Sequence, residues 1–396
     1  MDITKSTCGR ILRPVLLLAG GFLLATTPAT GQSDNISLSG RIGFRGEYIR
    51  NENFAENDAT RDDDHRVRFR VRVRIAGEYS PSEQVTLGLR FSTGSTAYPS
   101  SGWSSMNDDF RRDQIALDRA YVHLNVSERF QLRFGFDENP LFRSTELVWD
   151  GDVQPGGMSE VLSLGNVELV AGQFVLREVR SSKPDREENS FLLAHGISYR
   201  TDAGGADLRV GAFHYYYTDA DVLASALDKG TLDSDFKTNR FLPGDPTAYF
   251  SGYSILGGSV RYQRNDFTFA AEASVNLDAN DASSLGAAFE DKESLGFAAL
   301  VTYGRLRDPW DVNVTSGFFH IEADAVIAAF NSDDVQQTNL NTVPIWVRLR
   351  LPGGADLIWD TYIQSKIDES LASNGGIVHD ENATKIRTRI TLQARF

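Results

Sequence analysis

Apolar and polar residues alternate along most of this chain with a period of two. Between residues 36 and 48, one set of alternating positions carries Ile36, Leu38, Ile42, Phe44 and Tyr48. Between residues 66 and 79, valine, phenylalanine and isoleucine alternate with a row of basic residues, namely Arg66, Arg68, Arg70, Arg72 and Arg74. Strict alternation predicts a β-strand with one apolar face and one polar face. Similar segments lie at residues 85–91, 119–126, 130–136, 267–277, 295–303, 310–320, 345–351, 355–366 and 386–396.

The connections between these segments fall into two classes. Short turns near residues 80–82, 127–128, 165–166, 203–205, 265–266, 308–309 and 352–354 alternate with long polar loops near 51–64, 95–113, 138–154, 179–189, 219–248, 279–292, 324–341 and 368–382. Seven turns and eight loops predict sixteen strands. Short connections at one end and long ones at the other are typical of outer-membrane barrels. We therefore expect an all-β fold, a transmembrane antiparallel up-and-down β-barrel of about 16 strands. If the weaker strand pair at 156–164 and 167–178 fails, 14 or 18 strands are the alternatives.

Residues 1–31 are predicted to be a secretory signal peptide. Basic residues precede a short apolar run from Val15 to Ala25, and small residues before Gln32 suit a cleavage site. An uncleaved anchor is the alternative. Residues 32–396 then form a single barrel domain, which contains no cysteine because Cys8 is removed with the leader.

Composition excludes several other classes of protein. After residue 31 no apolar run is long enough for a spanning helix. A formal net charge of -14 argues against a nucleic-acid partner. The six histidines are scattered, and no hydrolase, P-loop or dinucleotide motif is present, so we expect no enzyme activity, no cofactor and no metal. Asp62, Asp63 and Asp64 are read as a solvated loop, with calcium binding as the alternative. A soluble β-sandwich or β-helix is the rival fold.

If the apolar faces meet lipid, the polar faces line a lumen wide enough to hold water. Closure of the barrel places the last strand, with Arg387 and Arg389, beside the first strand, with Arg41 and Arg45. The first strand also neighbours the strand that carries the arginines of residues 66–74. Arg348 and Arg350 lie on the wall two strands before the last strand. We expect this arginine wall to line the pore and favour anions, because arginine stays protonated. The alternative is that the arginines pair with lumen acids such as Glu47, Glu78 and Glu272 and only brace the wall. Trp149, Asp150 and Asp152 form a candidate constriction loop facing these arginines, or else a surface loop.

Three segments resemble the putative porin family of Gram-negative outer membranes. They are Asp118-Arg119-Ala120-Tyr121, the stretch from Glu138 to Gly157, and the run from Phe318 to Asp334. The closing amphipathic strand, which ends in Phe396, resembles the signal by which the barrel-assembly machinery recognises outer-membrane proteins. The family resemblance implies a β-barrel in the cell outer membrane and passive transport, with lipid and small hydrophilic or anionic solutes as partners. By analogy with other sixteen-stranded porins, it also suggests a homotrimer.

The sequence therefore predicts a diffusion porin with an arginine-lined, anion-favouring channel. Two alternatives remain open. One is a substrate-specific channel or exporter for acidic saccharides, because an arginine-lined lumen also suits an acidic polymer. The other is a non-conducting structural or adhesive barrel.

Overall fold

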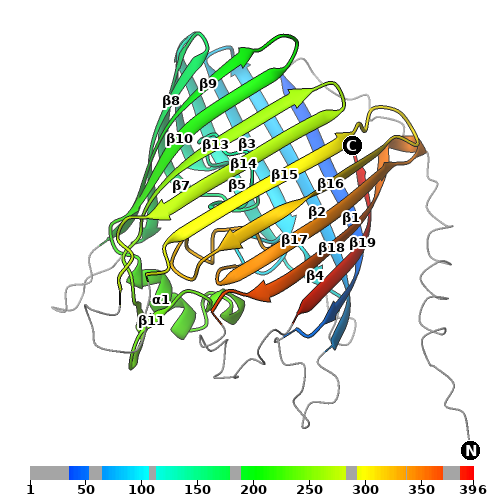
Figure 1. The fold of residues 1–396 in the computed structure, drawn as a ribbon. Helices are drawn as coiled ribbons and strands as arrows, with labels where there is room; N and C mark the ends of the chain where they lie inside the picture. The colour runs from blue at the N-terminus through cyan, green and yellow to red at the C-terminus, as the bar shows by residue number, and fades with distance from the viewer. Residues whose placement is uncertain are drawn as a thin grey trace, which may run out of the picture.

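A computed structural model describes residues 35–52, 65–106, 113–178, 189–281, 292–335, 337–368 and 384–396. Successive strands pair in antiparallel order, and the last strand pairs with the first, so the sheet closes into a barrel (Figure 1). The sheet contains 17 strands, of which β4 (Ser104–Ser105) has only two residues. Sixteen long strands therefore form the wall, and the predicted fold class and strand number are confirmed.

The long strands follow the alternating segments of the sequence closely. In the first half of the chain they are β1 (Ile36–Arg50), β2 (His65–Ser82), β3 (Val85–Thr93), β5 (Ile115–Ser127), β6 (Phe130–Phe136), β7 (Gly156–Leu164), β8 (Val167–Arg177) and β9 (Ser190–Asp202). In the second half they are β10 (Asp207–Tyr217), β13 (Ser254–Arg264), β14 (Phe267–Asn276), β15 (Leu295–Gly304), β16 (Val312–Ile321), β17 (Leu340–Arg350), β18 (Ala355–Lys366) and β19 (Lys385–Arg395). The weaker predicted pair at 156–164 and 167–178 is present as β7 and β8.

Short turns gather at one end of the barrel, and the long connections gather at the other. The loop at 219–248 was predicted without regular structure, but it contains helix α1 (Asp221–Asp228), a 3-10 turn η2 (Ser234–Phe236) and a small hairpin, β11 (Phe241–Leu242) with β12 (Asp245–Tyr249). Another 3-10 turn, η4 (Pro352–Gly354), joins β17 to β18. The predicted signal peptide, the Asp62–Asp64 cluster and parts of several predicted loops lie outside the described residues.

Strand β17 begins earlier than predicted. The predicted segment starts at Ile345, directly after Pro344, which has no backbone N–H and is disfavoured inside a strand. In the structure, β17 already begins at Leu340 and pairs with β18 throughout. The ladder to β16 is interrupted opposite Pro344, between the pairs Ser316 with Ile345 and Phe319 with Thr342. The proline is therefore tolerated at a gap in one of its two ladders.

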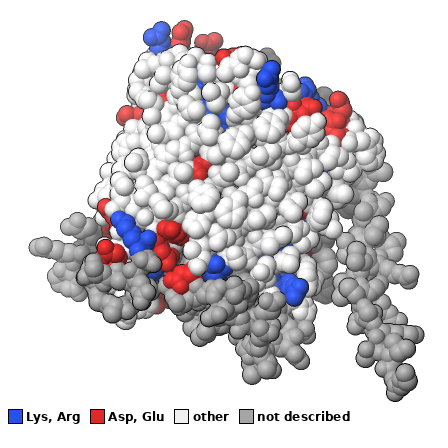
Figure 2. All heavy atoms as spheres, in the orientation of Figure 1, with Lys and Arg blue, Asp and Glu red and all other residues white. Residues whose placement is uncertain are grey.

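The outer surface of the barrel is an apolar belt. Large apolar side chains from almost every strand are exposed there, among them Leu38 (66%), Val67 (58%) and Tyr303 (68%), and Trp310 in the turn between β15 and β16 is 65% exposed. Figure 2 shows charged side chains gathered at the two rims, with a broad and almost uncharged band between them. This is the surface that a barrel presents to hydrocarbon. Within the described part of the chain, no helix has the length and apolar character needed to cross a membrane.

Strands β1 and β19 close the barrel in a fixed register. Gly40 and Phe396 exchange backbone hydrogen bonds of 2.9 and 3.1 Å. The Phe396 ring covers Gly40 so closely that a Cβ at this glycine would lie 2.1 Å from the ring. The pairing also sets Arg41 opposite Arg395 and Glu47 opposite Arg389, which brings the basic residues of the two chain ends onto one wall.

Candidate functional site

Two long loops fold into the barrel instead of standing on its rim. The first connects β6 to β7 across residues 137–155, and it reaches the opposite wall. Ser144 N donates to Ser259 Oγ at 2.7 Å, and Ser144 Oγ donates to the carbonyl oxygen of Ala271 at 2.8 Å, on β13 and β14. The second connects β16 to β17 across residues 322–339, and Asp150 N donates to the carbonyl oxygen of Phe330 at 2.7 Å. The two loops are therefore anchored to the wall and to each other.

Apolar side chains of the two loops fill one side of the lumen. Trp149 is 2% exposed and stacks on Tyr215 of β10 and on Phe330 of the second loop, with ring centroids 5.7 and 5.2 Å apart. Its indole N–H donates to the carbonyl oxygen of Val153 at 3.1 Å. Val326, Ile327 and other loop residues join this core. Because apolar packing occupies the side near β7 to β16, open space remains beside the arginine wall.

That space is a cavity of about 560 Å³ between the arginine wall and the loop tips. Strand residues supply its basic side, through Arg41, Arg45, Arg72, Arg348, Arg389 and Arg395. The inward loops supply its acidic side, through Glu146, Asp150, Asp152, Asp333 and Asp334. The cavity therefore has opposite charge on its two faces.

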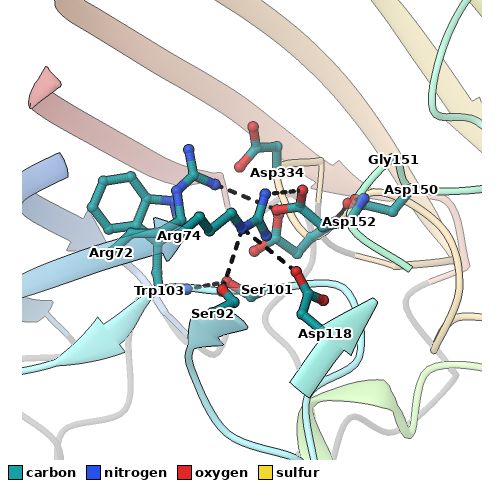
Figure 3. A network of polar contacts seen from close by, with 12 residues as sticks. Arg72, Arg74, Ser92, Ser101, Trp103, Asp118, Asp150, Gly151, Asp152 and Asp334 are labelled. Carbon is teal, nitrogen blue, oxygen red and sulfur yellow. Dashed lines mark hydrogen bonds and ion pairs between the residues drawn. The ribbon is translucent and has the colours of Figure 1, made fainter. Parts of the chain in front are cut away.

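Asp152 joins the first loop to the arginines of β2 (Figure 3). Its carboxylate accepts from Arg74 Nη1 at 2.7 Å and from Arg72 Nη1 at 3.3 Å. Burial opposes ionisation of Asp152, but Arg74 and Arg72 outweigh it, so the pKa of this carboxyl is lowered. Trp103, from the segment between β3 and β5, lies between two guanidinium groups, 4.0 Å from Arg45 and 4.5 Å from Arg72. Both contacts are cation–π interactions.

The second loop meets the arginines of β19. Arg389 Nη1 lies 2.5 Å from Asp334, and Arg389 also pairs with Asp360 of β18. Arg387 donates to Glu47 at 2.8 Å and to the carbonyl oxygen of Asp333 at 3.0 Å. Glu47 in turn accepts two bonds of 3.0 Å from Arg68. These arginines are therefore neutralised inside the wall.

Three further carboxyl groups of the loops are crowded together beside the cavity. Burial and neighbouring acids raise the pKa of Glu146 to about 7 and that of Asp333 to about 6, and they raise the pKa of Asp150 as well. Asp150 accepts from the backbone N–H groups of Asp152 at 2.6 Å and Asp333 at 3.1 Å. Ser332 Oγ donates to Glu146 at 3.1 Å. The loop contact thus contains carboxyl groups that bind protons near neutral pH.

The predicted arginines do not all have the same surroundings. Arg66 pairs with Glu52 at 2.9 Å and Arg350 pairs with Asp356 at 2.6 Å, both outside the cavity. Arg68, Arg70 and Arg387 surround Glu47. Of the other two acids named from the sequence, Glu78 accepts from the Tyr121 hydroxyl and Glu272 accepts from Thr145 N at 3.3 Å. Each of these five arginines is therefore compensated by a nearby carboxylate.

The predicted constriction residues also differ from one another. The loop does enter the barrel, and Asp152 contacts Arg72 and Arg74. Trp149 does not face the arginines, because its ring belongs to the apolar core. Asp150 lines the cavity, but its oxygens accept backbone N–H groups and form no ion pair with an arginine of the described chain.

The sequence predicts the second loop as a long polar connection at 324–341, but it does not indicate that this loop packs against the first one. Asp333 and Asp334 belong to this predicted connection, and the structure places them against Arg387 and Arg389 of the arginine wall. The signal that could have found this loop is the run AVIAAF at residues 325–330, because six apolar residues within a polar connection need burial. Trp103 was also missed, and nothing in its local sequence indicates its position between two arginines. Within the described residues, no group of histidine, cysteine or acidic side chains could hold a metal ion.

Comparison with known proteins gives a family and a set of similar folds. Residues 40–236 match the model of a family described as "Putative porin". Among solved structures, a mutant of the Rh. blastica porin is 13% identical, with a TM-score of 0.47, and the match covers 91% of this chain and 100% of that chain. A triple mutant of the Rhodopseudomonas blastica porin is 12% identical over the same shares, with a TM-score of 0.46. No curated protein matches this chain.

Proposed function

Because this chain belongs to the putative porin family through its residues 40–236, we propose that it forms a water-filled channel in the outer membrane of a Gram-negative bacterium. Small hydrophilic solutes diffuse through the channel passively, and anions pass more readily than cations. The protein acts as a porin and not as an enzyme.

The observation that carries this proposal is the cavity between the arginine wall and the inward loops. Seven arginines and six carboxylic acids line it. The pKa values of Glu146, Asp150 and Asp333 are raised, so part of the acidic charge is absent near neutral pH. Arginine keeps its charge throughout this range. A row of fixed positive charges in a narrow aqueous passage attracts anions and repels cations.

The separation of charge across the cavity supports a second property of the channel. Guanidinium groups lie on the strand side, and ionised Asp152 and Asp334 lie on the loop side. Opposite charges on facing walls produce a field across the passage. We expect this field to orient dipolar solutes and to slow apolar ones of equal size.

Planar-bilayer recording tests the proposed function. The purified protein is added to a lipid bilayer that separates KCl solutions of unequal concentration. We expect discrete current steps and a reversal potential on the anion-selective side. Absence of current steps from protein that is correctly folded would contradict a channel and favour the structural or adhesive alternative. A cation-selective reversal potential would contradict the role of the arginine wall.

The arginine wall also suits an acidic saccharide, and blocking experiments distinguish the two functions. A general porin is blocked weakly by acidic oligosaccharides, in proportion to their size. A saccharide-specific channel is blocked by the same molecules at low concentration. Two inward loops that occupy one side of the lumen favour small solutes over a polymer.

We further propose that Phe396 is part of the signal for barrel assembly and that the assembled protein is a homotrimer. The position of Phe396 at the β1–β19 closure supports its role, because pairing of this end completes the barrel. The trimer rests on analogy with other sixteen-stranded porins. Light scattering of the detergent-extracted protein tests it, and a monomer mass would contradict it.

A further inference from the structure

On the strand side of the cavity, three arginines have no acidic partner among the described residues; on the loop side, Arg143 donates to the Tyr215 hydroxyl at 3.3 Å and has no ion pair there either. Arg41 of β1, Arg45 of β1 and Arg348 of β17 line the cavity, and none of them forms an ion pair with any residue that the structure describes. Arg72 and Arg389, by contrast, hold Asp152 and Asp334. The wall therefore contains one set of arginines that secures the loops and another set whose charge remains available.

Arg45 is held in a fixed position although no acid neutralises it. Its Nε donates to Thr391 Oγ1 at 3.0 Å, and its guanidinium carbon lies 4.0 Å from the centre of the Trp103 ring. The residue is 7% exposed, and its Nη1 has no hydrogen-bond acceptor. Buried donors nearly always have a partner, so an orphaned one beside a cavity needs an explanation. A solute that supplies an oxygen atom is one such explanation.

Arg41 and Arg348 extend this charge along the cavity. Arg41 is opposite Arg395 on β19 and opposite Arg74 on β2, so basic residues flank it on both sides. Arg395 is itself only weakly paired, 3.8 Å from Asp356 with about half of its side chain exposed. Arg348 is exposed to the lumen. Repulsion within such a group is relieved when an anion binds between its members.

We propose that Arg41, Arg45 and Arg348 form a discrete binding subsite for the oxyanion group of a passing solute, either a carboxylate or a phosphate. The inference rests on the proposed channel function and deepens it by naming a solute class. The planar guanidinium group matches both oxyanions, because its N–H groups bind two oxygen atoms at once. Chloride has only a point charge and cannot use this geometry.

The acidic side of the cavity does not oppose the subsite. Asp152 and Asp334 are ionised, but each is already ion-paired with an arginine outside the subsite. Glu146 and Asp333, whose pKa values are raised to about 7 and about 6, carry a bound proton for part of the time near neutral pH. A cavity of about 560 Å³ is within the usual range for small-molecule sites, roughly 300 to 1,000 Å³.

The test measures block of chloride current through single channels in planar bilayers, with succinate and inorganic phosphate as separate probes at constant ionic strength. We expect a saturable fall in chloride conductance, with half-block at millimolar concentration for at least one probe. Succinate alone indicates a carboxylate subsite, phosphate alone a phosphate subsite, and both a general oxyanion subsite. No saturable block by either probe overturns the subsite, while the channel itself remains established by its chloride current.

Variants separate the subsite from general electrostatics. The double variant R41Q/R348Q should raise the half-block concentration at least tenfold, and R41K/R348K should fall between it and the wild type because lysine keeps the charge but not the fork. Arg261→Gln is the matched control, since Arg261 is exposed on β13, hydrogen-bonds to Gln263 and lies outside the cavity. An equal shift in Arg261→Gln, or no shift in R41Q/R348Q, would overturn the proposal. If neither the wild-type protein nor any variant conducts, the proposed channel function is contradicted instead of the subsite.

A second readout covers variants that conduct poorly. A ligand that binds only the folded state stabilises it against heat. Succinate or phosphate should raise the unfolding temperature of the wild-type protein in detergent and should not raise that of R41Q/R348Q. An equal rise in both proteins would overturn the subsite.

Discussion

Replacement of Asp152 by asparagine isolates the charge that neutralises the arginine wall. In the wild type, the Asp152 carboxylate accepts from Arg74 at 2.7 Å and from Arg72 at 3.3 Å. Asparagine has the same size and keeps one oxygen acceptor, so the loop retains part of this contact. The negative charge is lost, however. Arg72, which lines the cavity, then has no counter-charge, while Arg74 keeps Asp118 at 3.9 Å, and the net charge of the constriction rises by one.

The size of the effect follows from Coulomb's law. An ion that passes about 6 Å from one extra unit charge in water gains or loses roughly 0.7 kcal/mol. That energy corresponds to about a threefold change in local ion concentration. At about 0.1 M salt the Debye length is about 10 Å, so screening reduces the effect only in part. Anions gain while cations lose, and we therefore expect the chloride-to-potassium permeability ratio to increase about threefold to fivefold.

The structural cost of this substitution is small enough for the barrel to remain folded. The Asp152 side chain is 24% exposed, so solvent screens its ion pair with Arg74. Loss of this charge-assisted contact should lower the free energy of unfolding by about 1 kcal/mol. Ser144 and the Trp149 core still anchor the loop. The folded state is verified by the difference in gel mobility between heated and unheated samples.

Reversal potentials under a tenfold KCl gradient measure the permeability ratio. Asp207→Asn is the matched control, because Asp207 forms an exposed ion pair with Arg200 at the short-turn rim, away from the cavity. Asp152→Asn should move the reversal potential toward the chloride value, and Asp207→Asn should leave it unchanged. No movement, or movement toward the potassium value, would refute the role of Asp152 as the counter-charge of the arginine wall.

Four other changes probe separate parts of the structure. Trp103→Ala removes the cation–π contacts with Arg45 and Arg72, each typically worth about 1 to 2 kcal/mol when buried. Block of the current by oxyanions should weaken several-fold in this variant, whereas Trp103→Phe should retain most of the block. Equal block in the wild type and both variants would contradict a role of Trp103 in holding the arginines. Anion selectivity should rise as the pH falls from about 8 to about 5, because Glu146 takes up a proton near pH 7 and Asp333 takes one up near pH 6. Glu146 faces the carboxyl groups of Asp152, Asp333 and Asp334. Asp333 faces Asp334 and the basic residues Arg70, Arg387 and Arg389. Because both pKa values are raised in the folded protein, these two groups stabilise the packed loops fully below their ordinary pKa, and the stabilisation is lost as the pH rises through about 6 to 7. Proteolysis of the loops should therefore be faster at pH 8 than at pH 5. Asp333→Asn should flatten the pH dependence of both selectivity and proteolysis, and unchanged pH dependence would contradict the role of Asp333. Asp324→Asn removes the carboxylate charge that the buried Arg240 guanidinium contacts at 2.9 Å, and it should lower the free energy of unfolding by about 3 kcal/mol. The unfolding temperature should fall, and proteolytic cleavage within residues 322–339 should be faster. Equal stability of the variant and the wild type would contradict the role of this ion pair as an anchor of the second loop. Deletion of Phe396 should lower the fraction of folded barrel in the outer membrane at least several-fold relative to Phe396→Tyr, and equal yields would argue against an assembly role.

The wall of the barrel was predictable because its strands repeat one simple pattern. Alternation in β1 and β2 fixes which side chains face inward, and the closure of β1 on β19 follows from the strand order alone. The sequence therefore indicates that Arg45, Arg70 and Arg389 share a wall. Pro344 shows the limit of the rule, since a break in one ladder accommodates a residue that normally ends a strand.

The interior could not be predicted in the same way, because loops carry no periodic signal. Asp152 and Asp334 neutralise particular arginines only because two connections fold inward and pack on each other through Trp149 and Phe330. Neither contact is local in the sequence. The choice between a selective wall and a braced wall thus depends on loop conformation. The structure shows that loop acids pair with Arg72 and Arg389, and the selectivity of the remaining arginines is our proposal.

The most direct test of the account compares the reversal potential of the wild-type channel with that of R41Q/R348Q under the same KCl gradient. We expect discrete ohmic current steps in both, an anion-selective potential in the wild type, and a clear shift toward the potassium value in the variant. Identical potentials in the two proteins would contradict the claim that these unpaired arginines set the charge of the passage.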